Sequence, residues 1–467
     1  MVLLSSSCAN VPSNGKQTSE RAAQATDVIS SSGNIARAVF RATAVAAVRQ
    51  PVTTFKLGLV TLWQRPREII VGNLPFDWPS QAALPDVPGT WQFEKLLDRK
   101  HFPAAESGSL KWLVDGPGFF PEVDRQLASA TRSIDAQVFI FDNDDIGVRY
   151  ADALKNRAAQ VRVRVLFDDF GSTFSWTASP ATLGEPGFVP PSDMEDYLTN
   201  HSKVKVRRTL NPWLACDHTK LFVFDRRTAI LGGMNIGREY YSEWHDLMVR
   251  VEGPVVGSLA REFNRAWRKA GPSGDFALFR KPRIFRRHKP VTEGIPLRIL
   301  RTDPAESRYD ILDATLLAIR GARKRIWIET PYFGHDDIVS ACAAAAGRGV
   351  DVRVILPASG DSPIMDAGNL ATANTLIRAG AKVFRYPKMT HMKVMICDGW
   401  ACAGSANLDT LSMRINRELD LAFSQPAAVR ELEKVVFTPD FRRSRRVELA
   451  ETESAAAGIA ETLVDQL

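Results

Sequence analysis

The sequence has no uninterrupted apolar run of eighteen residues, so it predicts no membrane-spanning helix. Cysteine is scarce, with five residues at positions 8, 216, 342, 397 and 402. Their odd number and the lack of any C-x-x-C spacing support neither a disulfide framework nor a zinc site. The seven histidines form no H-x-x-x-H cluster. We therefore expect no metal and no cofactor.

Positive charge is in excess. The chain of 467 residues has a net charge of +7 and a sequence pI near 9.2. Such a balance favours anionic partners, either nucleic acid or an anionic membrane surface. The length predicts two or three domains, or one large duplicated unit.

The N-terminal residues 1–92 are predicted to be a disordered or basic amphipathic segment followed by a proline-rich linker. Within them, residues 34–49 have helical character that ends before Pro51. This helix could lie on a membrane, or it could pack on the protein surface. The first ten residues are similar to the end of a bacterial lipoprotein signal, with Cys8 as the lipidated residue, although a disordered terminus explains them equally well.

The rest of the chain repeats itself. Residues 121–168 and 308–356 both read as an amphipathic helix, an apolar strand, a second helix and a second apolar strand. This alternation is typical of an α/β fold with a mostly parallel or mixed sheet flanked by helices. We expect two similar domains, at 93–272 and 296–467, joined by a basic linker at 273–295. A pseudo-two-fold pair packed face to face is the simplest arrangement.

Each half contains one H-x-K-x-x-x-x-D segment. The segments are His218-Lys220-Asp225 and His391-Lys393-Asp398. If each segment is a strand, its His and Lys project from the same face, and a phosphate is a suitable partner for these two groups. The aspartates lie at odd offsets and should point away, so we assign them to support of the site.

Other candidate residues follow each motif at similar distances. A carboxylate can fix the tautomer of an imidazole, and each half offers one, with Asp246 28 residues after His218 and Glu418 27 residues after His391. Candidates for hydrogen bonds to the non-bridging oxygens of a phosphate are Asn235, Asn407, Ser405 and the amides around Gly233.

These groups suit a two-histidine mechanism. One neutral imidazole attacks phosphorus and forms a phosphohistidine, while the other, protonated, donates to the leaving group. The two lysines supply the positive charge that a metal would otherwise provide.

At these residues the chain resembles the phospholipase D superfamily, and within it the bacterial cardiolipin synthases. The likeness includes the segments 232–237, 244–246, 330–333 and 404–409, and it covers roughly residues 110–440. It implies His218 as nucleophile and His391 as acid and base, or the reverse. It also implies a bacterial protein that acts on phospholipids, with an alcohol or water as acceptor. Typical members begin with two spanning helices and this sequence predicts none, so we expect a peripheral membrane protein.

This sequence departs from the family beside the first histidine, where it has Asp217 and Thr219, and this difference leaves the substrate open. A superfamily nuclease and a non-catalytic lipid-binding protein are the alternatives. Nucleic acid is the less favoured partner, because basic residues do not alternate with stacking aromatic residues.

Overall fold

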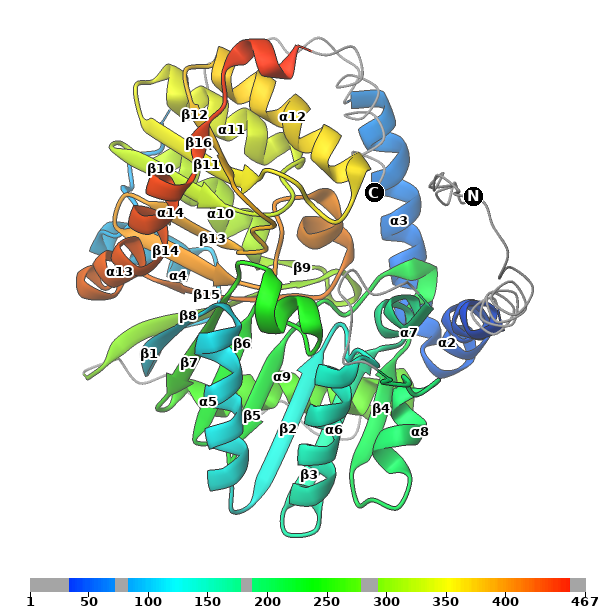
Figure 1. Cartoon of the computed structure of the whole chain (residues 1–467). Coiled ribbons are helices and arrows are strands. Elements are labelled where there is room, and N and C mark those ends of the chain that lie inside the picture. The colour runs from blue at the N-terminus through cyan, green and yellow to red at the C-terminus, as the bar shows by residue number, and fades with distance from the viewer. Residues whose placement is uncertain (1–32, 72–82, 178–186, 279–292, 454–467) are drawn as a thin grey trace.

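The computed structural model describes residues 33–71, 83–177, 187–278 and 293–453. Its centre is a continuous mixed sheet with two halves (Figure 1). From the outer edge inward, the first half contains β4 (Lys205–Thr209), β3 (Arg162–Asp168), β2 (Ser133–Val138), β5 (Leu221–Phe224), β6 (Thr228–Gly232), β7 (Leu247–Glu252) and β1 (Glu106–Val114). The second half repeats this order with β16 (Arg445–Arg446) at its edge, then β12 (Lys382–Tyr386), β11 (Asp351–Pro357), β10 (Arg325–Glu329), β13 (Val394–Cys397), β14 (Trp400–Gly404), β15 (Glu418–Phe423) and β8 (Ile295–Asp303).

The repeated helices and strands are those expected. In the first half α5 (Asp115–Ser129), β2, α6 (Asp145–Ala158) and β3 follow one another, and in the second α10 (Asp310–Gly321), β10, α11 (Asp336–Gly347) and β11 do so. Parallel pairing joins β2 to β3 and β3 to β4, and likewise β10 to β11 and β11 to β12. The strands that carry the motifs pair antiparallel with their neighbours, so the sheet is mixed.

Further helices complete the layers on the sheet. They are α4 (Trp91–Arg99), α7 (Asp169–Thr177), α8 (Met194–Thr199), α9 (Val255–Lys269), α12 (Pro363–Arg378), α13 (Pro426–Leu432) and α14 (Thr438–Arg443). One face of each half has its own apolar core. A third core is shared, since it contains Val223 of β5, Phe263 of α9, Ile396 of β13 and Phe437.

The two halves meet at their edge strands. β1 pairs antiparallel with β8 from Glu106↔Leu297 to Gly108↔Ile295, and the two strands lie side by side at the junction in Figure 1. The pseudo-two-fold pair is confirmed, but the expected face-to-face packing is wrong at this junction. Edge pairing satisfies the backbone groups that an open edge would leave exposed.

The H-x-K residues lie just before the strands on which we had placed them. β5 begins at Leu221 and β13 at Val394, so both histidines and both lysines precede their strands. Short bridges instead join Asp217 to Arg417 and His245 to Thr390. The backbone beside each motif therefore leaves its own half of the sheet and pairs with the other half.

The N-terminal region contains more helix than expected. Residues 33–49 are helical, as predicted, but α3 (Pro51–Val71) occupies part of the predicted linker. Proline fits the first position of a helix because no hydrogen bond to its nitrogen is required there. None of the helices in the described part of the chain is both long and apolar enough to span a membrane. Cys8 and most of the basic linker lie outside the described residues, and the domain boundaries stay predictions.

Candidate active site

His218 is held by a carboxylate from the second half of the chain. Its Nδ1 lies 2.9 Å from Oε1 and 3.1 Å from Oε2 of Glu418, at the start of β15. The backbone brings these residues together, because the amide of His218 donates to the carbonyl of Arg417 at 2.9 Å. Since Nδ1 is engaged by the carboxylate, Nε2 is the ring nitrogen that can face a substrate.

His391 is held in the same way by the first half. Its Nδ1 lies 2.6 Å from Oδ2 of Asp246, which immediately precedes β7. Its backbone amide donates to the carbonyl of His245 at 2.6 Å. Both histidines and both carboxylates are buried, so the two half-sites repeat one geometry.

The spacing along the chain suggests that each carboxylate supports the histidine of its own half. In the structure each carboxylate supports the histidine of the other half. Asp246 supports His391, and Glu418 supports His218. The cause is the pair of backbone bridges that cross between the halves next to each motif. Neither half alone therefore contains a motif histidine together with the carboxylate that supports it.

The two motif lysines lie beside the histidines. Lys220 Nζ donates to the carbonyl of His218 at 2.7 Å, and Lys393 Nζ donates to the carbonyl of His391 at 2.5 Å. The ammonium of Lys220 also lies 5.2 Å from the centre of the Phe139 ring. Each ammonium keeps further N–H groups for an anion, because a lysine has three.

The buried cations lower one another's pKa. Burial, and then the charges of Lys220 and Lys393, hold the pKa of His218 well below its usual range. Burial, and then the charges of Lys393, Lys220 and His218, hold the pKa of His391 well below its usual range. Burial lowers the pKa of Lys220 to about 7 and that of Lys393 to about 8. A bound phosphate would oppose these shifts, since it brings a negative charge to the site.

The two carboxylates have raised pKa values for the same reason. Burial raises the pKa of Glu418 to about 8, although the nearby charge of Lys220 opposes the shift. Burial raises the pKa of Asp246 to about 7, against the effect of Lys393. The site is therefore poised to exchange protons near neutral pH.

Ser405 and Gly233 occupy equivalent positions in the two halves, and each lies against the carboxylate of its own half. The hydroxyl of Ser405 donates to Oε2 of Glu418 at 2.5 Å and accepts from the amide of Leu419 at 3.0 Å. A Cβ on Gly233 would lie 2.2 Å from Oδ1 of Asp246, so glycine allows that carboxylate to lie against the backbone. The hydroxyl of Ser405 gives its proton to Glu418, and its expected contact with a phosphate stays a prediction.

The two asparagines are partly engaged as well. Asn235 accepts from the amides of residues 139–140 at 3.2 and 3.0 Å and donates to the hydroxyl of Tyr240 at 2.8 Å. Asn407 donates to Oδ2 of Asp409 at 3.3 Å. Each side-chain amide has a second N–H, so contact with a phosphate stays a prediction for both.

The motif aspartates lie at the far ends of their strands from the histidines. Asp225 accepts from the backbone amides of residues 131–133 at 2.7 to 2.8 Å. Asp398 accepts from those of residues 323–325 at 2.8 to 2.9 Å. Both have positive φ, 52° and 49°. They fix the turn that precedes β2 or β10, in keeping with the supporting role that we assigned to them.

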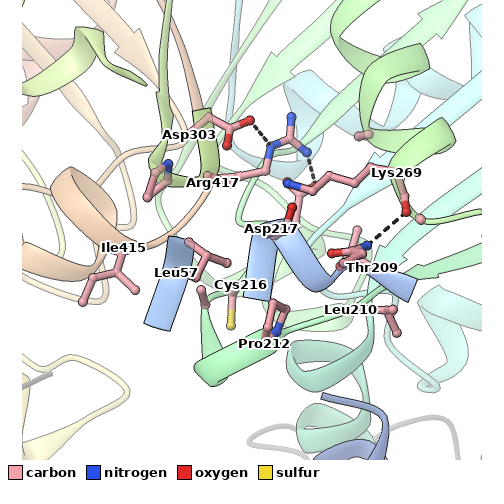
Figure 2. A pocket seen from close by; sticks show the side chains of 17 residues that line it. Leu57, Thr209, Leu210, Pro212, Cys216, Asp217, Lys269, Asp303, Ile415 and Arg417 are labelled. Carbon is pink, nitrogen blue, oxygen red and sulfur yellow. Dashed lines mark hydrogen bonds and ion pairs between the residues drawn. The ribbon is translucent and has the colours of Figure 1, made fainter. Parts of the chain in front are cut away.

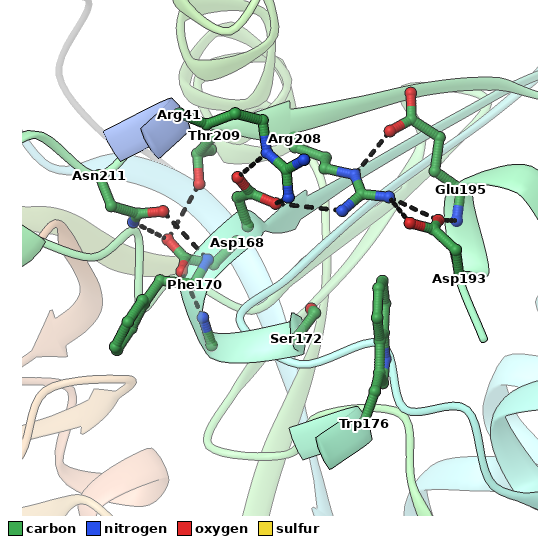
Figure 3. Close-up of polar contacts among 12 residues, drawn as sticks. Arg41, Asp168, Phe170, Ser172, Trp176, Asp193, Glu195, Arg208, Thr209 and Asn211 are labelled. Atoms are coloured by element: carbon green, nitrogen blue, oxygen red, sulfur yellow. Dashed lines mark hydrogen bonds and ion pairs between the residues drawn. The ribbon is translucent and has the colours of Figure 1, made fainter. Parts of the chain in front are cut away.

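Asp168, which no sequence motif indicates, holds the chain just before His218. Its contacts with Thr209 and Asn211 are seen in Figure 3. This fully buried carboxylate accepts from the amide of Asp217 at 2.8 Å. It also accepts from Thr209 Oγ1 at 2.9 Å and from Asn211 Nδ2 at 2.6 Å. Its position at the end of the apolar strand β3, directly before a second aspartate, is the feature of the sequence that could have indicated it.

A pair of cations just before the two carboxylates was also missed. Arg417 precedes Glu418 and donates to Asp217 at 2.6 Å. His245 precedes Asp246 at the equivalent place, with Nδ1 2.8 Å from Asp115 and Nε2 3.1 Å from Asp440. Burial alone lowers the pKa of His245, but these two carboxylates raise it to about 10. Alignment of the two halves would have revealed this equivalence.

In two groups of described residues, three atoms that could bind a metal lie within 4.8 Å of one another. The groups are His245, Glu329 and Asp440, and Asp142, Asp144 and Glu239. Neither group includes His218 or His391. In the first group, the imidazole already bonds to two carboxylates, which suits a protonated ring.

Comparisons with known proteins agree with this geometry. Residues 123–267 and 316–437 match the family model of the phospholipase D-like domain of cardiolipin synthases. Cardiolipin synthase A of Pseudomonas putida strain W619 is 31% identical over 360 residues, which cover 74% of this chain and 71% of that protein. Cardiolipin synthase A of Pseudomonas aeruginosa strain LESB58 is 29% identical over 411 residues, covering 82% and 80%.

Among solved structures, phosphatidylserine synthase of Haemophilus influenzae Rd KW20 superposes with a TM-score of 0.61 and 14% identity. The match covers 80% of this chain and 99% of that one, and it shows a shared fold. The duplicated fold with its paired half-sites defines a phospholipase D-type phosphatidyltransferase. The chain belongs to the phospholipase D-like family of cardiolipin synthases.

Proposed function

We propose that the chain transfers a phosphatidyl group from one membrane phospholipid to an alcohol, as a cardiolipin synthase does, through a phosphohistidine and without a metal. The observation that carries the proposal is the crossed pair of buried dyads, His218 with Glu418 and His391 with Asp246. Of two equivalent imidazoles with fixed Nδ1 atoms, one can act as the nucleophile and the other as the general acid and base.

In the first step, Nε2 of His218 attacks phosphorus, and the bond from phosphorus to the leaving oxygen breaks. His391 gives its Nε2 proton to that oxygen. The His218 ring becomes positively charged, and Glu418 stabilises this charge across a buried hydrogen bond of 2.9 Å. Asp246 supports the protonated form of His391 in the same way.

In the second step, the now neutral His391 removes the proton of the acceptor hydroxyl. The acceptor oxygen attacks phosphorus and the P–N bond to His218 breaks. His391 ends protonated and His218 neutral, so the cycle returns every proton. Throughout, the ammonium groups of Lys220 and Lys393 face the charge on the non-bridging oxygens, and each such donor is typically worth about 10²–10³ in rate.

Lipid analysis of cells tests this proposal. Cells that overproduce the chain should contain more cardiolipin than cells that overproduce the His218→Ala variant at equal protein level. Accumulation of phosphatidic acid would instead indicate water as the acceptor. Identical lipid profiles would contradict phosphatidyl transfer.

The purified protein allows a sharper version. With phosphatidylglycerol as donor, omission or addition of glycerol as acceptor should change the product ratio. Excess EDTA should leave the rate unchanged, because lysines supply the positive charge. A rate abolished by EDTA and restored by a divalent cation would contradict the metal-free scheme. Cleavage of plasmid DNA with no lipid product would favour a nuclease.

A further inference from the structure

The N-terminal helices are apolar on the face that points away from the protein. On α3 the exposed positions follow helical spacing, and most are large and apolar: Val52, Phe55, Leu59, Leu62 and Trp63. Phe55 and Trp63 are 68% and 71% exposed. The preceding helical residues 33–49 continue this face with Val39, Phe40 and Val48. We refer to these eight side chains as the outer apolar face.

The inner face of the same helices is mostly small or polar. The buried positions of the first helical stretch are Ala38, Ala42 and Ala46, followed by Gln50, and those of α3 are Thr53, Leu57, Gly58 and Thr61, of which Leu57 alone is large and apolar. The hydroxyl of Thr61 is buried and has no hydrogen-bond partner within the described part of the chain. A surface helix normally places its apolar residues inward. These helices reverse that rule over about thirty residues, too many for scattered exposed side chains to explain.

Polar contacts fix this orientation. Arg41 forms two hydrogen bonds with Asp169, at 2.5 and 2.8 Å, and Arg208 donates to the same carboxylate at 3.1 Å (Figure 3). Thr53 donates to Asp275 through its amide at 2.8 Å and its hydroxyl at 2.5 Å. The helices therefore cannot simply rotate to bury their outer apolar face.

The outer apolar face lies beside the active site. α3 packs on the turn Pro212–Leu214, and the indole of Trp213 donates to the carbonyl of Thr54 at 2.8 Å. Trp213 and Leu214 are themselves half-exposed, and His218 follows four residues later. Leu57 of α3 lines a cavity of about 40 Å³ together with Asp217 and Arg417, the neighbours of His218 and Glu418 (Figure 2).

The charge of the segment selects the partner. Between residues 33 and 63 the charged residues are Arg37, Arg41, Arg49 and Lys56, all basic, and Arg41 is paired with Asp169. A second copy of the chain would bring the same positive charge against itself in a two-fold contact. A membrane with anionic headgroups offers both an apolar phase and an opposite charge.

We propose that the outer apolar face inserts into the interface of an anionic phospholipid bilayer and holds the active site at the membrane surface. The choice of a bilayer rests on the phosphatidyl transfer proposed above. The loop before His218 would then lie at the level of the headgroups.

Flotation of the full chain with vesicles tests the proposal without any turnover measurement. The test variant combines Phe55→Gln, Leu59→Gln and Leu62→Gln, which change exposed side chains only. The matched control combines Trp91→Gln, Val189→Gln and Ile364→Gln, three exposed apolar residues elsewhere. Vesicles of phosphatidylglycerol and of phosphatidylcholine serve as the anionic and neutral surfaces.

We expect the unmodified chain and the control to float with phosphatidylglycerol vesicles and far less with phosphatidylcholine. The test variant should lose at least about tenfold in partitioning, since binding scales with buried apolar area. Its hydrolysis or transfer of a short-chain phospholipid below the micellar concentration should stay unchanged. Flotation does not depend on turnover. An inactive protein that floats would therefore refute the proposed function but still support membrane binding by the outer apolar face.

Two outcomes would overturn the proposal. In the first, the test variant floats as well as the unmodified chain, or neither floats. In the second, the unmodified chain ignores vesicles and sediments as a dimer that the test variant converts to a monomer. That result would make the outer apolar face a contact between two copies.

Discussion

Replacement of Glu418 by glutamine removes a buried group that can take a negative charge and keeps the size of the side chain. The carboxylate lies 2.9 and 3.1 Å from Nδ1 of His218 and receives the hydroxyl of Ser405 at 2.5 Å. A hydrogen bond to a charged group contributes about 1.5–3 kcal/mol, which corresponds to a rate factor of about 10 to 150. If the new amide turns its NH₂ toward Nδ1 and selects the wrong tautomer, the loss reaches about 10⁴.

The assay is steady-state cleavage of a soluble short-chain phosphatidylglycerol by Glu418→Gln. We expect kcat to fall by at least about tenfold, while KM changes little because Glu418 contacts the histidine rather than the substrate. Glu433→Gln is the control, because Glu433 forms an ion pair with Arg325 at 2.7 Å on a different part of the same half. A kcat of Glu418→Gln within threefold of the unmodified protein would refute the role of this carboxylate.

The same variant tests the exchange between halves. With only seven histidines, ¹⁵N-histidine labelling gives a spectrum in which His218 and His391 can be assigned by substitution. Glu418→Gln should shift the ring nitrogens of His218 and leave His391 nearly unchanged, and Asp246→Asn should do the reverse. The opposite pattern would show that each carboxylate serves its own half.

Three other predictions follow from the site. Sulfate, a dianion throughout the range, should bind more weakly as pH rises from 6 to 9, because Lys220 and Lys393 lose their protons near pH 7 and 8; calorimetry that shows a constant affinity would contradict this. Ser405→Ala should lower kcat by about three- to tenfold with KM unchanged, since Glu418 loses one neutral donor; a change in KM alone would place Ser405 on the substrate instead. Asp225→Ala should lower the free energy of unfolding by about 2–3 kcal/mol in urea titrations, because three backbone amides lose a charged acceptor, with kcat per folded molecule unchanged; a large loss of kcat in folded protein would return Asp225 to the chemistry.

The hydrophobic pattern and the repeated motif in the sequence predicted the order of helices and strands in each half. The alternation of helix and strand in residues 121–168 and 308–356 is found in α5 to β3 and α10 to β11. The repeated motif predicted one duplicated unit. α3 was missed because its prolines suggested a linker, although Pro51 occupies a position where a helix accepts proline.

The exchange of carboxylates could not be predicted from spacing. Asp246 and Glu418 lie at almost the same distance after their own histidines, and nothing local to either segment distinguishes pairing within a half from pairing between halves. The choice is made by the backbone bridges from Asp217 to Arg417 and from His245 to Thr390, which exist only once the two halves have docked. Tertiary contacts of this kind leave no periodic trace in the sequence.

The central claim is that one of the two crossed histidines carries the phosphatidyl group between donor and acceptor. It is tested most directly by acid-free quenching of a single turnover, followed by proteolysis and mass spectrometry. The account predicts a phosphatidyl adduct on the peptide of His218, absent in His218→Ala. An adduct on the His391 peptide would exchange the two roles, and product formation with no adduct on either histidine would contradict the account.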